Sequence, residues 1–97
     1  MIRHVVMFSW TAEATPQQKK RALTELRALP ALMKGMRSYH AGPDAGLAAG
    51  NFDFAVVADF DDAASFAAYR DHPAHRAVVE ESIAPIRQAR AAVQYEI

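Results

Sequence analysis

The segment Tyr69-Arg70-Asp71-His72-Pro73-Ala74-His75 holds the residues best suited to proton chemistry in this chain. A neutral imidazole can remove a proton near neutral pH, and a phenol can donate a hydrogen bond to an oxyanion that develops on a carbonyl. Tyr69 and His75 are six positions apart across Pro73, and ordinary helix spacing does not bring such residues together. They meet only if the chain turns at the proline. In that case the segment is a candidate for acid–base catalysis.

The remaining histidines allow more than one interpretation. His4 shares one face of an apolar stretch with Ile2 and Val6, so it is either a core histidine with a hydrogen-bond partner or part of a pocket wall. His72 and His75 have i, i+3 spacing, but no third ligand follows at a suitable distance. We therefore expect no metal site, and no sequence motif predicts a cofactor.

Composition limits the function classes. The chain has 97 residues, which is the size of one domain, here residues 1–97. Lys plus Arg and Asp plus Glu are balanced at 11 each, so no overall positive field predicts a nucleic-acid partner. The absence of cysteine and of a long apolar run predicts a cytoplasmic protein with no membrane partner. An apolar share of 52% favours self-association.

Periodicity predicts the elements that position the motif. Alternation predicts a strand at Ile2–Trp10, and Thr15-Pro16 predicts the start of a helix that ends near Leu29, before a loose turn at Pro30. The further predicted elements are a strand at 36–41, a loop to Asn51, a strand at 52–60, a helix capped by Asp61 or Asp62, a second helical segment from Pro73 to Pro85, and a strand at 89–97.

The order strand, helix, strand, strand, helix, strand is typical of the ferredoxin-like split βαβ arrangement, an α+β fold. It predicts a four-stranded antiparallel sheet with both helices on one face. Because the strands carry apolar side chains on both faces, the uncovered face predicts a homodimer that packs sheet against sheet around a barrel-like interior.

The chain resembles the stress-responsive A/B barrel (Dabb) family of dimeric α/β barrels over nearly its whole length. The resemblance rests on the stretches Arg3-His4-Val5-Val6, Leu29-Pro30-Ala31-Leu32-Met33, Phe52 to Phe60, and Tyr69 through His75, of which His72-Pro73-Ala74-His75 is the most specific. The best understood member type is the plant olivetolic acid cyclase, which closes a polyketide ring without a cofactor.

The resemblance implies site residues. By motif position, His75 would remove the proton α to a carbonyl, while Tyr69 would hydrogen-bond the carbonyl oxygen. His4 and His72 would line the substrate site. Phe54 would also line it, at a strand position where the cyclase has another histidine.

Two functions follow from these observations. One is a cofactor-free cyclase or lyase type of enzyme that binds a small carbonyl compound between the helices and the sheet. The other is a non-catalytic dimer that binds an apolar ligand or has a structural role under stress. A cavity that touches both Tyr69 and His75 favours the first, whereas a closed, packed segment favours the second.

Overall fold

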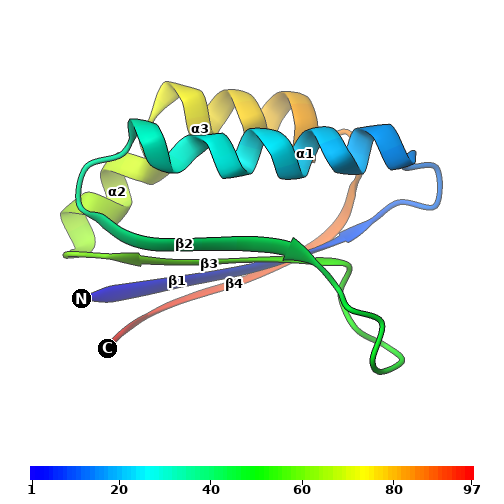
Figure 1. Cartoon of the computed structure of the whole chain (residues 1–97), viewed down its shortest axis with the longest axis horizontal. Coiled ribbons are helices and arrows are strands. Elements are labelled where there is room, and N and C mark those ends of the chain that lie inside the picture. The colour runs from blue at the N-terminus through cyan, green and yellow to red at the C-terminus, as the bar shows by residue number, and fades with distance from the viewer.

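The computed structural model describes residues 1–97 as two layers, a four-stranded antiparallel sheet with every helix on one of its faces (Figure 1). The strands are β1 (Ile2–Trp10), β2 (Met36–Pro43), β3 (Phe54–Phe60) and β4 (Arg87–Glu96), and they lie in the order β2-β3-β1-β4. The helices are α1 (Pro16–Ala28), α2 (Ala63–Asp71) and α3 (Pro73–Val78). The 3₁₀ turn η1 (Leu29–Leu32) follows α1, and the π-helical turn η2 (Val79–Ile83) follows α3. The predicted split βαβ topology is confirmed.

Local sequence explains where the helices begin. Thr15 forms a capping box with Gln18, in which the Thr15 hydroxyl accepts from the Gln18 amide and the Gln18 side chain accepts from the Thr15 amide. Of the two predicted caps for α2, the structure uses Asp62, whose carboxylate accepts from the Ser65 amide at 2.8 Å. Pro30 lies in η1, which is the loose turn predicted after Leu29.

The predicted boundaries of three strands need correction, and one of them is β4, which was predicted at 89–97 and spans Arg87–Glu96. The strand predicted at 52–60 begins only at Phe54, and the Asp53 carboxylate just before it accepts a hydrogen bond from the Trp10 amide at 2.7 Å. The strand predicted at 36–41 continues to Pro43, where it still pairs with Phe54. The loop between β2 and β3 extends away from the sheet (Figure 1).

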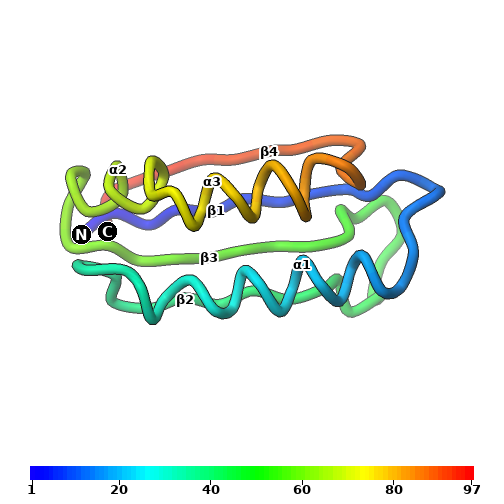
Figure 2. Tube along the Cα trace, turned by 90° about the horizontal axis from the view of Figure 1, so that it is seen from above, coloured from blue at the N-terminus to red at the C-terminus, as the bar shows by residue number.

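The helices cover the sheet unevenly. Viewed from above, α1 lies over the β2 side, α2 and α3 lie toward β1, and β4 forms the far edge (Figure 2). The side chains of β1 that face the helices are buried, namely His4, Val6, Phe8 and Trp10. None of the helices is long and apolar enough to span a bilayer.

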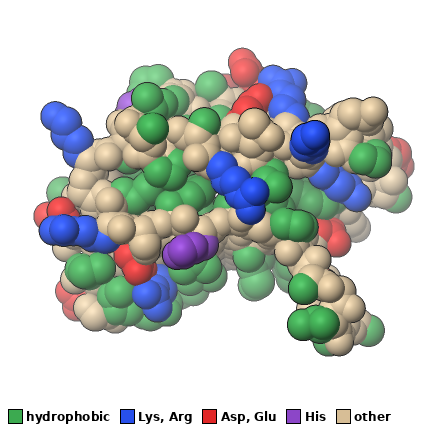
Figure 3. Space-filling view, in the orientation of Figure 1, with side chains coloured by type: hydrophobic (Ala, Val, Ile, Leu, Met, Phe, Trp, Pro, Cys, Tyr) green, Lys and Arg blue, Asp and Glu red, His purple; other side chains and the backbone are tan.

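The face of the sheet away from the helices is largely apolar. Val5 pairs with Val57 on one side and Val93 on the other, and Met7 lies between alanines of β3 and β4. An ion pair between Arg3 and Asp59, with 2.7 Å between Nε and Oδ1, crosses the same face. Hydrophobic side chains gather beneath the sheet and on the projecting β2–β3 loop (Figure 3). Apart from that ion pair and the β2 side chains Ser38 and His40, which lie opposite Asp59 and Val57, this face therefore offers a surface suited to another protein.

Candidate active site

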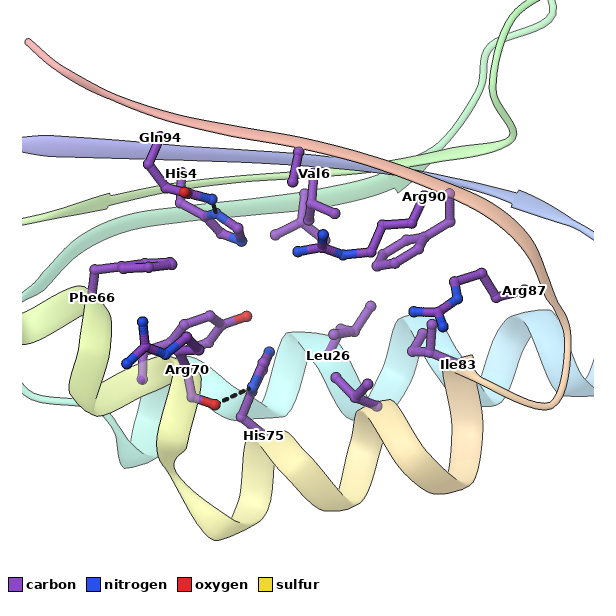
Figure 4. A pocket seen from close by; sticks show the side chains of 15 residues that line it. His4, Val6, Leu26, Phe66, Arg70, His75, Ile83, Arg87, Arg90 and Gln94 are labelled. Carbon is purple, nitrogen blue, oxygen red and sulfur yellow. Dashed lines mark hydrogen bonds between the residues drawn. The ribbon is translucent and has the colours of Figure 1, made fainter.

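A cavity of about 370 Å³ lies between the β1–β4 half of the sheet and helices α2 and α3 (Figure 4). Its inner wall is apolar and includes Val6 and Phe8 of β1, Val56 of β3, Leu26 of α1 and Ile83 of η2. Polar side chains from α2, α3, β1 and β4 complete the lining. An apolar hollow of this size with a few convergent polar groups is the usual form of a small-molecule site.

Both residues of the predicted catalytic pair line this cavity, and the break at Pro73 brings them together. The Tyr69 and His75 rings have centroids 4.3 Å apart at an interplanar angle of 45°. Tyr69 is in the last turns of α2, whereas His75 is in the first turn of α3, and the change of direction between these helices folds one ring against the other. The expected turn is therefore present.

The same break fixes the orientation of His75. The end of α2 leaves the Arg70 carbonyl without the helical partner that an uninterrupted helix would supply, because the Ala74 amide donates to His72 Nδ1 at 3.0 Å instead. His75 Nδ1 lies 3.0 Å from the Arg70 oxygen. A carbonyl can only accept, so Nδ1 carries the proton and Nε2 of the neutral ring is the basic nitrogen. The His75 ring is directed from α3 into the cavity (Figure 4).

Burial sets the protonation states of the pair. Desolvation lowers the pKa of His75, against the opposing effect of its bond to the Arg70 carbonyl, and the nearby Arg90 lowers it further. The imidazole is thus neutral at neutral pH. Burial raises the pKa of Tyr69 to about 12, so its hydroxyl keeps its proton. One group can take a proton and the other can donate a hydrogen bond.

His4 contributes a second oriented imidazole to the cavity wall. It is 5% exposed, and its ring centroid lies 6.2 Å from that of Tyr69. Desolvation, with the positive charge of Arg90, lowers the pKa of His4 to about 4, so the ring is neutral. Gln94 Nε2 donates to His4 Nδ1 at 2.8 Å, which leaves the proton of His4 on Nε2. Nε2 of His4 therefore donates a hydrogen bond, whereas Nε2 of His75 accepts one.

Two of the predicted substrate-binding residues do not line this cavity. His72 caps α3 through its bond to the Ala74 amide, and so it holds the turn that orients His75. Phe54 is 4% exposed and packs against Trp10 with ring centroids 5.7 Å apart, away from the catalytic pair. The cavity brings together Tyr69, His75 and His4 and leaves the other two outside.

Sequence reasoning missed the residues that β4 and α2 add to the wall. These are Phe66, Arg70, Arg87, Arg90, Ala92 and Gln94. The strand register was the available signal for two of them, since in the antiparallel pair Gln94 lies opposite His4 and Arg90 lies opposite Phe8. No group of three His, Asp or Glu side chains is placed to hold a metal ion.

Residues 2–97 match the family model of the stress-responsive A/B barrel domain, abbreviated Dabb. The chain belongs to this family. This Dabb chain is similar to a dimeric ferredoxin-like protein of unknown function from Thermobifida fusca, with 48% identity, a TM-score of 0.92, and coverage of 99% of this chain and 90% of the other.

Two further solved structures show the same fold. A dimeric protein of unknown function from Bacteroides fragilis is 25% identical, with a TM-score of 0.84 and coverage of 99% of this chain and 95% of the other. The hydroxynitrile lyase from Passiflora edulis is 20% identical, with a TM-score of 0.85 and coverage of 99% and 92%. At this last identity the likeness concerns the fold alone. No curated protein matches the sequence.

Proposed function

We propose that this Dabb protein catalyses cofactor-free proton transfer on a small carbonyl compound bound in the cavity. The observation that carries the proposal is the pairing of Tyr69 with a neutral His75 whose free nitrogen is fixed by the Arg70 carbonyl. A base with a set tautomer, beside a protonated phenol on an apolar wall, has the parts that enolate formation requires.

The proposed step moves one proton. His75 Nε2 takes it from the carbon α to the carbonyl, and the electron pair of the C–H bond passes to the carbonyl oxygen. The Tyr69 hydroxyl donates a hydrogen bond to that oxygen as its negative charge grows, and His4 Nε2–H is a second donor on the same wall. The enolate then attacks a second carbonyl, as in a polyketide ring closure, or is reprotonated by His75.

We further propose that the protein acts as a homodimer through the face of the sheet that the helices leave uncovered. Large apolar side chains on that face are well exposed in the single chain, among them Val93 at 54% and Tyr95 at 45%. Burying such a surface is favourable by roughly 25 cal/mol per Å². Sedimentation equilibrium should give twice the chain mass of 10.7 kDa; a stable single chain would contradict this proposal without affecting the cavity.

Hydrogen–deuterium exchange tests the catalytic step. Acetophenone, a neutral aryl methyl ketone, should exchange its methyl protons in D₂O faster with the protein than in buffer of the same pH, as followed by proton NMR. His75→Ala should lower the enzymatic exchange rate by about 10²-fold or more, and Tyr69→Phe should lower it less, because it removes a hydrogen bond rather than the base.

Arg27→Gln on α1 is the control, since Arg27 bonds the Ala41 carbonyl outside the cavity. It should leave the exchange rate unchanged. An exchange rate in His75→Ala equal to that of the wild type would refute the assigned base.

The second candidate function uses the same cavity without chemistry. The apolar inner wall favours a module that binds an apolar ligand and in which Tyr69 and His75 only complete the turn. Binding of acetophenone by the wild type without any accelerated exchange would favour this function over catalysis.

A further inference from the structure

Two arginines of β4 extend into the cavity without acidic partners. Arg87 and Arg90 both line it, and their side chains reach inward from the strand (Figure 4). Neither takes part in an ion pair. No Asp or Glu lines the cavity, so the charge of these two groups is not balanced within it.

The other arginines of the chain have partners. Arg3, Arg21, Arg37, Arg70 and Arg76 each lie within ion-pair distance of a carboxylate, and Arg27 donates to the Ala41 carbonyl at 2.8 Å. A third arginine of the cavity, Arg70, is thus paired with Asp71, with 2.9 Å between Nε and Oδ1, and Arg76 shares this carboxylate. The arginines without such a partner are therefore Arg87 and Arg90, and both lie on the β4 side of the cavity.

A β-bulge places both unpaired groups on the same side of the sheet. In a regular strand, residues 87 and 90 would face opposite sides. The register of β4 shifts between Ser9 and Trp10, so that Ala89 pairs with Ser9 and Arg87 with Trp10, while Gln88 is the extra residue. Trp10 and Phe8 face the helices, and so do their partners Arg87 and Arg90.

The cavity thus has two chemically different parts. Its inner wall is apolar, with Tyr69, His75 and His4 at one end, whereas its β4 side carries two guanidinium groups on an edge strand that solvent reaches. Guanidinium groups bind carboxylate and phosphate oxygens through paired hydrogen bonds.

We infer that the ligand of this cavity carries an oxyanion, a carboxylate or a phosphate, that Arg87 and Arg90 bind at the β4 side while its apolar body lies against the inner wall. The placement of its carbonyl beside Tyr69 and His75 rests on the proposed function, but the binding of the anion does not. The two guanidinium groups anchor the ligand, and Tyr69 and His75 act on it.

Three probes with one aryl methyl ketone body test the inference. They are 4-acetylbenzamide, which is neutral, 4-acetylbenzoate and 4-acetylphenyl phosphate, each titrated by calorimetry at low salt. The wild type should bind at least one of the two anions about 10-fold or more tightly than the amide. The double variant Arg87→Gln/Arg90→Gln should bind all three with the affinity of the amide, and which anion the wild type prefers distinguishes the two oxyanions.

Arg76→Gln is the matched control, because it removes one positive charge close to the site but outside the cavity lining. It should keep the preference for the anion. The variant Arg87→Lys/Arg90→Lys, which keeps the charge but loses the paired donors, should retain only part of it. Circular dichroism should show the folded spectrum in every variant, as expected for changes on an exposed edge strand.

Equal affinity of the wild type for the amide and both anions would overturn the inference. A loss of preference in Arg76→Gln as large as in the double variant would overturn it too, because the effect would then come from overall charge. His75→Ala should keep the preference for the anions over the amide, because the preference depends on Arg87 and Arg90. Anion binding that persists in a protein without proton exchange would leave this inference standing while the proposed catalysis fails.

Discussion

The strands β3 and β4 flank β1 in the same antiparallel manner, yet β3 fills the space under the helices with side chains and β4 leaves part of it empty. On the helix side, β3 presents Phe54, Val56, Ala58 and Phe60, which are between 0% and 4% exposed. At the matching positions along β1, β4 presents Arg90, Ala92 and Gln94, all of them exposed. One side of β1 is therefore solid core, and the other is a cavity.

The difference shows that the side chains of β4, together with its place at the edge of the sheet, leave room for the cavity. His4 illustrates the difference between the two strands, because it pairs with Ala58 of β3, next to the core, and with Gln94 of β4, next to the cavity. Val6 likewise lies between Val56 and Ala92. A strand with small and polar inward residues leaves room next to a core that is otherwise filled.

The largest expected effect is the difference in unfolding free energy between a side-chain truncation in β3 and one in β4. Phe60→Ala in β3 should lower the free energy of unfolding by about 3–5 kcal/mol, because Phe60 is fully buried and a void would remain. Gln94→Ala in β4 should cost only about 1 kcal/mol, the loss of one hydrogen bond to His4. Urea denaturation at one protein concentration measures both. Equal losses would mean that β4 is as tightly packed as β3.

The second prediction concerns His4, which lies on β1 between β3 and β4. Its pKa is about 4 in the folded protein, below the ordinary value of about 6.5 in the unfolded chain. The unfolded chain therefore binds more protons between these values, and stability falls as the pH drops from about 6.5 to about 4. Across this pH range, His4 lowers the free energy of unfolding by about 3 kcal/mol, at about 1.36 kcal/mol per pKa unit.

His4→Gln isolates this contribution from that of the carboxylates. The difference in unfolding free energy between wild type and variant, measured from pH 7 to pH 4, should shrink by roughly that amount as the pH falls. A difference that stays constant with pH would show that His4 is not held in its neutral form.

The smallest expected effect comes from filling the cavity on the β4 side of β1. Ala92→Leu should lower the affinity for acetophenone by about 10-fold or more, because the added side chain occupies the cavity. It should change the unfolding free energy little, since it enters empty space rather than packed core. Ala77→Leu, at an exposed position of α3, is the matched control and should not affect binding. Unchanged affinity in Ala92→Leu would place the ligand elsewhere.

Much of the fold could be predicted from the sequence because its signals are local. Period-two alternation marked β1 and β3, Thr15-Pro16 marked the start of α1, and Asp61 or Asp62 was predicted as the cap of α2. The start of β3 was predicted two residues early, because the alternation continues to Phe52 although the strand ladder begins only at Phe54. A pattern in one segment carries no information about where its pairing with another segment ends.

The site could be predicted only in part, for a related reason. Of the residues that line the cavity, Tyr69, His75 and His4 were named from residue type and motif, whereas Arg90 and Gln94 were not, since the choice of which face of β4 meets the helices is not local. Alternation alone is misleading here: the more apolar face of β4, with Val93 and Tyr95, is the one that the helices leave uncovered. Only the pairing of β4 with β1 assigns the faces.

The bulge at Gln88 ties ligand charge to strand register. If Gln88 took the place of Arg87 opposite Trp10, alternation along β4 would be regular and the Arg87 guanidinium would turn to the opposite side of the sheet, while every residue from Ala89 onward kept its place. A relative of the same length whose last strand lacks the bulge would then hold one cation in the cavity instead of two. Among proteins of this fold, one bulge at the start of the last strand can thus change which ligands are accepted without altering any residue that performs the chemistry.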